Sequence, residues 1–469
     1  MRNYIYCDRK KNRPPRPGRR LTGILVLALA GVILLELGLM ARELKSRYGA
    51  APGAPVVEVR SASASGPAPP AAGPELGKKD LAELIGARDL PADEQRLFSV
   101  TDRRGNHLYV RTTILPELQA LGDSWVKGSR AHQAALVLLD PDSGEVLTLA
   151  GYSENEGDPH PALAGSFPAA SLFKIVTAAA AVEKAELSAD SRLAYDGGKH
   201  TLFKNNVAKE ADEGRRATTL RESFADSINS VFGKLGASTL GSGELADFAA
   251  RFGFNHEIDF EMPVEASSFS VDDDDAFHLA ELASGYNRAT KVSPLHGALM
   301  AAAVAAGGNV YDPSLVREVF DRENRIYYQA GRSGGRQVIS PATAGELSRL
   351  MLSAVEEGTG RRTFGNASAH PVLSRLLIGG KSGTINNDLG QKVDWFVAWA
   401  QPRPGEACPD RLALSAVVVH SGATRTTSQR LVRDALDAYY RERLDAGNSP
   451  TSKPGGAAFS GRMGYNGDD

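Results

Sequence analysis

The chain has 469 residues, which is long enough for one large domain or two medium ones with proper cores. Its formal net charge is only -2, but residues 1–20 carry eight Lys or Arg against one Asp, so the remainder carries -9. Because the basic tail adjoins an apolar segment and the body is acidic, the charge distribution argues against a nucleic-acid-binding protein.

An apolar segment at residues 21–41 contains a single charged side chain, Glu36. At ~1.5 Å per residue, a helix of this length spans about 30 Å, the thickness of a bilayer's hydrocarbon core. We therefore predict a cytoplasmic basic tail at 1–20 and one transmembrane anchor at 21–41 in the inner (cytoplasmic) membrane, with the rest periplasmic. The alternative is a cleaved signal peptide, but its apolar region would be only ~7–15 residues long.

Composition divides the rest of the chain into three parts. Residues 42–95 are rich in Ala, Pro, Gly and Ser and predict a flexible stalk, with a short amphipathic stretch near 81–85 that fits a helix. Residues 447–469 are small and polar and predict a disordered tail. Residues 96–446 remain as the folded body.

The cysteines and histidines indicate neither a disulfide nor a metal site. Cys7 and Cys408 would lie on opposite sides of the membrane, so they could not pair. The nine His residues are scattered without metal-ligand spacing. We expect no metal and no cofactor.

The folded body begins and ends with strand signals. Two apolar runs at 134–139 and 145–150 flank an Asp-Pro-Asp-Ser-Gly turn and predict a hairpin. Later strands are expected at 376–384, 393–400 and 412–420. Helices are expected between and after these strands, two of them starting with Ser-Pro, at 171–187, 220–236, 243–251, 293–307, 340–358 and 428–444.

This order of elements predicts an α+β fold. Two early and three late strands can join into one antiparallel five-stranded sheet, flanked by helices and carrying an inserted helical subdomain. A cleft is expected where the sheet meets the helices.

The first candidate for chemistry is Ser171-Leu-Phe-Lys174, at the expected start of a helix. Positions i and i+3 share a helix face, so the Lys174 amine can reach the Ser171 hydroxyl and act as its base. Lys can do so only when neutral, and lowering its pKa by ~3 costs about 4 kcal/mol. The pattern alone is weak, because Ser124-Trp-Val-Lys127 matches it too.

The second candidate is Ser227-Ile-Asn229, in the helical part. Ser227 can relay a proton to a leaving amine, and Asn229 can orient the Lys or bind a substrate amide. An ordinary turn or N-cap pair is the alternative, and Ser153-Glu-Asn155 has the same pattern.

The third candidate, Lys381-Ser-Gly-Thr384, lies at the end of an expected strand and occurs once. Ser382 and Thr384 offer hydroxyl groups, Lys381 offers a cation, and Gly383 lets a ligand approach the backbone. Together these groups suit the binding of a carboxylate. The alternative is an edge strand with a solvated Lys.

In their order and spacing, the three motifs resemble those of the transpeptidase domain of penicillin-binding proteins, within the active-site serine penicillin-recognising enzymes. The resemblance covers about residues 110–444 and includes the segment 111–119, the hairpin at 134–146 and Asp394-Trp-Phe-Val-Ala-Trp399. It implies a β-lactamase/transpeptidase-like fold for the penicillin-binding transpeptidase domain at 96–446.

The resemblance also implies a role for each motif. Ser171 would be the acylated nucleophile and Lys174 its base, while Ser227 and Asn229 complete the second motif. The carboxylate of the substrate or drug would bind to Lys381, Ser382 and Thr384. The backbone N–H groups of Ser171 and Thr384 would form the oxyanion hole.

The function implied is a membrane-anchored D,D-transpeptidase that cross-links peptidoglycan stem peptides and is acylated by β-lactams. No glycosyltransferase domain fits before the body, so a separate glycosyltransferase is an expected partner, and the short stalk leaves the subclass open. Three alternatives remain: a D,D-carboxypeptidase, a β-lactamase using the same serine, and a catalytically silent cell-wall scaffold or β-lactam sensor.

Overall fold

A five-stranded antiparallel sheet organises the computed structural model, which describes residues 75–85, 96–208, 216–271, 275–331, 335–365 and 367–446. Its strands, in spatial order, are β13 (Leu376–Asn386), β14 (Lys392–Pro402), β15 (Leu412–His420), β3 (Gln133–Leu139) and β4 (Val146–Ser153). The sheet is therefore built from both ends of the domain, and the predicted five-stranded antiparallel sheet is confirmed. Strand β13 is at one edge of the sheet.

Both faces of the sheet are buried, because its strands are apolar on both sides. Alternate residues of β3 contribute to two separate hydrophobic cores. The first core contains Ala135, Val137 and Leu139, and the second contains Ala134, Leu136 and Leu138. This two-sided burial explains why the strands are near-continuous apolar runs.

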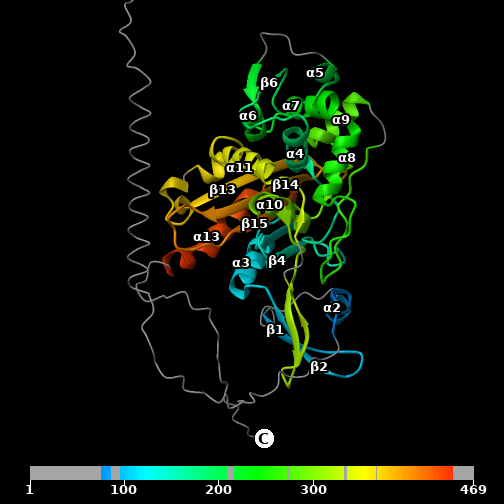
Figure 1. Cartoon of the computed structure of the whole chain (residues 1–469), viewed down its shortest axis with the longest axis vertical. Coiled ribbons are helices and arrows are strands. Elements are labelled where there is room, and N and C mark those ends of the chain that lie inside the picture. The colour runs from blue at the N-terminus through cyan, green and yellow to red at the C-terminus, as the bar shows by residue number, and fades with distance from the viewer. Residues whose placement is uncertain are drawn as a thin grey trace, which may run out of the picture. The chain divides into compact units, whose positions relative to one another are not determined.

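Helices cover each face of the sheet (Figure 1). The first core holds α4 (Lys174–Lys184), α10 (Pro294–Ala305) and α11 (Pro341–Glu356). The second holds α3 (Pro116–Lys127) and α13 (Ser428–Ala446). The Ser-Pro starts act as predicted: the hydroxyls of the Ser residues before α10 and α11 accept backbone N–H bonds from the third residue of each helix.

The helical region between α4 and α10 differs from the prediction in one important detail. The single helix expected at 220–236 is wrong, because the chain forms α6 (Leu220–Ala225) and then α7 (Asn229–Lys234). Ser227 lies between them with φ of 55°, a left-handed conformation that interrupts a helix. The region continues with η2 (Leu235–Leu240), α8 (Gly241–Phe252) and α9 (Ala276–Ser284).

A second, four-stranded sheet was not predicted from the sequence. Its order is β1 (Leu97–Thr101), β2 (His107–Thr112), β10 (Val316–Asp321) and β11 (Ile326–Gln329). Helix α2 (Lys78–Ile85) buries Leu81 and Ile85 in the core of this sheet. The expected helix near 81–85 therefore forms, and it packs on a folded element.

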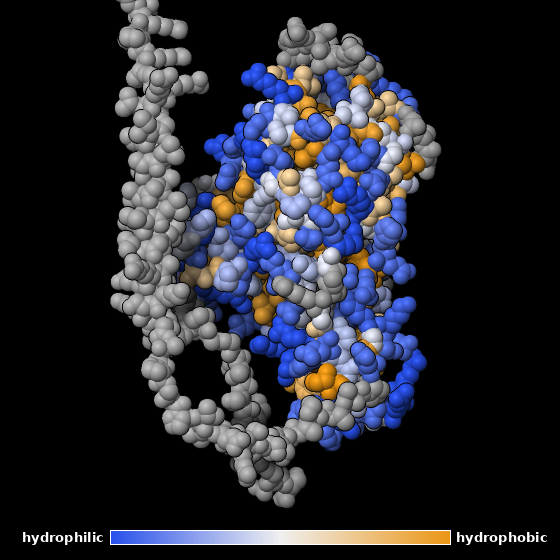
Figure 2. All heavy atoms as spheres, viewed as in Figure 1, coloured by the Kyte–Doolittle hydropathy of each residue, from blue (hydrophilic) through white to orange (hydrophobic). Residues whose placement is uncertain are grey.

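Short elements complete the described part. They are β5 (Phe167–Pro168), η1 (Ala170–Phe173), β6 (Arg192–Tyr195), α5 (Lys204–Ala208), β7 (Arg216–Thr219), β8 (Lys291–Val292), β9 (Asn309–Val310), β12 (Arg336–Gln337), α12 (Arg361–Phe364), η3 (Ala367–Ala369) and η4 (Leu373–Arg375). On the face seen in Figure 2 the surface is largely hydrophilic, with hydrophobic residues in small separate patches.

The predicted basic tail (1–20), anchor (21–41), most of the stalk and the C-terminal tail (447–469) lie outside the described residues. Within the described ranges, no helix combines the length and apolar character that crossing a membrane requires.

Candidate active site

Three segments that are far apart in the sequence meet beside strand β13. Ser171 lies in η1, Ser227 in the break between α6 and α7, and Lys381 on β13 itself. Lys174 Nζ is 2.8 Å from Ser171 Oγ, and Lys381 Nζ is 3.0 Å from Ser227 Oγ. The fold therefore brings the three motifs into one site, with two fully buried lysine amines.

The Lys174 amine has three hydrogen-bond neighbours: Ser171 Oγ at 2.8 Å, Asn229 Oδ1 at 2.7 Å and the Ser284 carbonyl at 2.7 Å. Asn229 is held in this orientation because its Nδ2 donates to the His200 carbonyl. The two carbonyl oxygens can only accept, and a neutral amine has two N–H groups and one lone pair. With both N–H groups on these carbonyls, the lone pair of Lys174 faces the Ser171 hydroxyl.

Electrostatics favour that neutral amine. Burial lowers the pKa of Lys174 well below its usual 10.5, and the positive charge of Lys381 lowers it further. The surroundings are also apolar, since the Phe232 ring centroid lies 5.7 Å from Lys174 Nζ. Lys174 is therefore suited to accept a proton from Ser171.

Lys381 occupies a different environment. Its amine donates to Ser227 Oγ at 3.0 Å and to the Ser382 carbonyl at 2.9 Å, close to the Phe224 ring. Burial lowers the pKa of Lys381 to about 7. A chain of polar groups thus runs from Lys381 to Ser227, which can pass a proton to a group bound in the cleft.

Close backbone packing places the nucleophile. A Cβ on Gly285 would lie 1.8 Å from the Ala170 carbonyl oxygen, so only Gly allows the end of α9 to approach η1 so closely. A Cβ on Gly383 would lie 3.3 Å from the backbone nitrogen of Ser171. The backbone of β13 therefore passes directly beside the Ser171 N–H, as an oxyanion hole shared with Thr384 requires.

Two further groups at the site were missed by sequence reasoning. The Ser284 carbonyl holds Lys174, and Thr359 Oγ1 accepts a hydrogen bond from Ser382 Oγ at 2.7 Å. A backbone carbonyl leaves no trace in the side-chain pattern, so Ser284 could not have been found. Thr359 follows α11 and reaches the site through the packing of Gly358 against Ala225.

The other matches to the motif patterns do not join the site. Ser124 and Lys127 lie on α3, on the opposite side of the sheet. Ser153 Oγ instead donates to Asp158 at 2.6 Å in a local turn.

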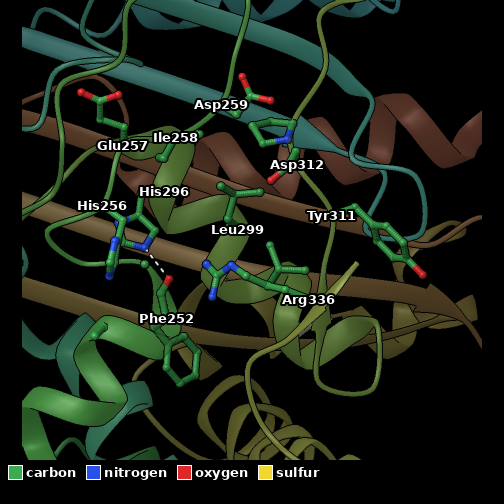
Figure 3. A pocket seen from close by; sticks show the side chains of 14 residues that line it. Phe252, His256, Glu257, Ile258, Asp259, His296, Leu299, Tyr311, Asp312 and Arg336 are labelled. Atoms are coloured by element: carbon green, nitrogen blue, oxygen red, sulfur yellow. Dashed lines mark hydrogen bonds between the residues drawn. The ribbon is translucent and has the colours of Figure 1, made fainter. Parts of the chain in front are cut away.

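A separate cavity of about 320 Å³ lies near the C-terminal end of α8 (Figure 3). His296 lines it and donates from Nε2 to the Phe252 carbonyl, and burial lowers the pKa of His296 to about 4. None of the three motifs lines this cavity. The neutral, buried His296 is a structural residue of α10.

Comparison with known proteins agrees with the geometry. The family model described as the penicillin binding protein transpeptidase domain matches residues 134–435. The peptidoglycan D,D-transpeptidase PbpA of Mycobacterium tuberculosis is 26% identical over 372 residues, covering 71% of this chain and 70% of that protein. Stage V sporulation protein D of Bacillus subtilis is 23% identical over 260 residues, covering 53% and 39%.

Solved structures agree on the fold. The D,D-transpeptidase domain of a peptidoglycan glycosyltransferase from Eggerthella lenta has a TM-score of 0.58 at 24% identity, covering 71% of this chain and 83% of that one. The imipenem acyl-enzyme complex of penicillin-binding protein A from M. tuberculosis has a TM-score of 0.54 at 24% identity, covering 70% and 79%.

The chain belongs to the penicillin-binding protein transpeptidase family, since the family model matches well over half of its length. The resemblance stated from the three motifs is confirmed. So is the class of enzyme, a serine-type D,D-transpeptidase.

Proposed function

We propose that this protein is a membrane-anchored D,D-transpeptidase that cross-links peptidoglycan stem peptides through an ester on Ser171. One observation carries the proposal: Lys174 Nζ lies 2.8 Å from Ser171 Oγ and also contacts two carbonyl oxygens, at Asn229 and Ser284, which can hold both N–H groups of a neutral amine. A serine hydroxyl becomes a useful nucleophile only when such a base takes its proton.

The reaction follows from the positions of these groups. Ser171 Oγ attacks the carbonyl of the penultimate D-Ala and passes its proton to Lys174. The developing oxyanion is stabilised by the backbone N–H groups of Ser171 and Thr384, each such donor contributing ~2.7–4 kcal/mol in the transition state. Ser227, supported by Lys381, protonates the leaving D-Ala nitrogen.

The substrate carboxylate is assigned to β13. Ser382 and Thr384 present hydroxyl groups, and Lys381 supplies positive charge behind them. The same groups suit the carboxylate of a β-lactam, which would acylate Ser171 and leave a stable ester.

The remaining assignments rest on the sequence. Residues 21–41 would anchor the chain in the inner membrane, and the transpeptidase domain at 96–446 would be periplasmic. Residues 42–95 would form the stalk, except that α2 near its end packs on the four-stranded sheet. Residues 1–20 and 447–469 would form the two tails. A separate glycosyltransferase would supply the glycan strands.

Labelling with fluorescent penicillin tests the proposal. Wild type should label covalently and should release D-Ala from a stem peptide, whereas Ser171→Ala should do neither. Equal labelling of the two proteins would refute the role of Ser171.

The same experiment separates the alternatives. Rapid turnover of nitrocefin would indicate a β-lactamase, and release of D-Ala without any cross-linked product would indicate a carboxypeptidase. A β-lactam sensor would label without releasing D-Ala, and a silent scaffold would not label at all.

A further inference from the structure

A basic cavity adjoins the carboxylate-binding end of β13. Its volume is about 710 Å³, and it is lined by residues of α12, of β14, of the loop after β15 and of the start of α13. Five of its lining residues are Arg or Lys and one is acidic. The basic residues are Arg362, Lys392, Arg425, Arg430 and Arg433.

The positive charge of this cavity is largely uncompensated. Its one acidic residue, Asp394, accepts hydrogen bonds from the backbone N–H and the hydroxyl of Ser428, so it serves the start of α13. Among the described residues, no acidic side chain pairs with Arg362, Lys392 or Arg425, and the other two arginines share Asp434. Such a cavity attracts anions.

The cavity adjoins the carboxylate-binding residues of β13 at two points. Thr359 lines it and accepts the hydrogen bond from Ser382 Oγ at 2.7 Å. Asp394 lines it and is the cross-strand partner of Thr384, so their side chains project from the same face of the sheet. The cavity therefore begins where the carboxylate of the leaving D-Ala is assigned.

Reaction chemistry then suggests the occupant. In the second half of transpeptidation, the acceptor amine attacks the ester carbonyl, the new C–N bond forms and the bond to Ser171 Oγ breaks. Ser227, which gave its proton to the leaving amine, takes a proton from the acceptor amine, and Lys174 returns the proton it holds to Ser171 Oγ. By microscopic reversibility, the acceptor amine enters where the leaving amine departed, on the side of the carboxylate-binding residues Ser382 and Thr384.

We propose that the basic cavity is the acceptor subsite and binds the free carboxylate of the acceptor stem peptide. This inference rests on the proposed function, and it assigns a binding site to the second substrate, the acceptor stem peptide. The volume lies within the range of ligand pockets, ~300–1,000 Å³, and holds more than the single residue that leaves.

The test compares two acceptors that differ only in charge: Nα-acetyl-L-Lys-D-Ala and its C-terminal amide. Full-length wild type is given a donor peptide ending in D-Ala-D-Ala, and the ratio of transfer to hydrolysis is measured by mass spectrometry. Wild type should favour the free acid by about tenfold, and raising the ionic strength should reduce this preference.

The double variant Lys392→Gln/Arg425→Gln should lose the preference and its salt dependence, while Lys79→Gln should keep both. Lys79 is a matched control because it is an exposed cation on α2, outside the cavity. Penicillin labelling of the double variant reports whether its acylating site is intact.

Equal use of the two acceptors by wild type, or an unchanged preference in the labelled double variant, would overturn the acceptor subsite. If the double variant fails to label, Lys392→Gln and Arg425→Gln are measured singly, and each should reduce the preference by part of the tenfold effect. Failure of the proposed function is distinguishable, since wild type would then transfer the acyl group to neither acceptor: a carboxypeptidase would release D-Ala with hydrolysis only, and a sensor or scaffold would release none.

Discussion

Changing Asn229 to Asp would test the neutral state of Lys174 directly. Asn229 Oδ1 lies 2.7 Å from Lys174 Nζ in a buried setting, and Asp has nearly the same shape but carries a negative charge. An opposite charge within ~4–6 Å changes a pKa by ~1–3. A rise of about 2 in the pKa of Lys174 lowers the fraction of neutral amine about 100-fold at pH values below that pKa.

The assay is the second-order rate constant for acylation by a β-lactam, measured across pH. Acylation requires neutral Lys174, so the rate rises with pH on the acid side. In Asn229→Asp this acid limb should move about 2 pH units upward, because the new carboxylate stabilises the protonated amine.

Asn229→Ala is the matched control. It also removes the Nδ2 donor to the His200 carbonyl and leaves one N–H of Lys174 unpaired, at a cost of about 1–3 kcal/mol. Acylation should fall roughly 5- to 150-fold at every pH, and the acid limb should not move upward. If the limb of Asn229→Asp coincides with that of wild type, the base is a group other than Lys174.

Two further predictions concern other parts of the site. Burial lowers the pKa of Lys381 to about 7, and its protonated form binds the carboxylate, so the rate of acylation should decline above about pH 7. This decline should be absent from Lys381→Gln. If the decline persists in that variant, it is due to the titration of another group. Gly285→Ala should lower the free energy of unfolding by about 2–4 kcal/mol in urea denaturation, because the new Cβ would overlap the Ala170 carbonyl and because residue 285 has a φ of 69°. The control is Gly243→Ala, which has open space at its Cβ and should be neutral or stabilising. A stable Gly285→Ala would contradict the close packing of α9 against η1.

The elements predicted correctly are those specified by local sequence. The five strands of the main sheet are long apolar runs, and the helices after Ser293 and Ser340 are fixed by a capping hydroxyl and a Pro in the first turn. The three motifs could be recognised because their side chains carry the chemistry. These signals depend on neighbouring residues alone.

The features that were missed depend on partners far away in the chain. Strands β2 and β10 pair across about 200 residues, so neither could be recognised as part of a sheet from its own pattern. The helix pattern at 220–236 is continuous, yet the chain breaks at Ser227. Tertiary contacts, including the bond from the Thr359 N–H to the Ala225 carbonyl, hold this break against local helix propensity.

At the two buried lysines, activity and stability favour opposite properties. Folding buries the amine of Lys174 and lowers its pKa, so near neutral pH the unfolded chain binds more protons than the folded one. Burying this group therefore reduces stability at neutral pH, and the penalty shrinks as pH rises toward the unfolded pKa. The cores on both faces of the sheet offset that penalty, so the protein can retain the buried Lys174 amine beside Ser171. An apolar side chain at this position would increase stability, but the catalytic base would be lost.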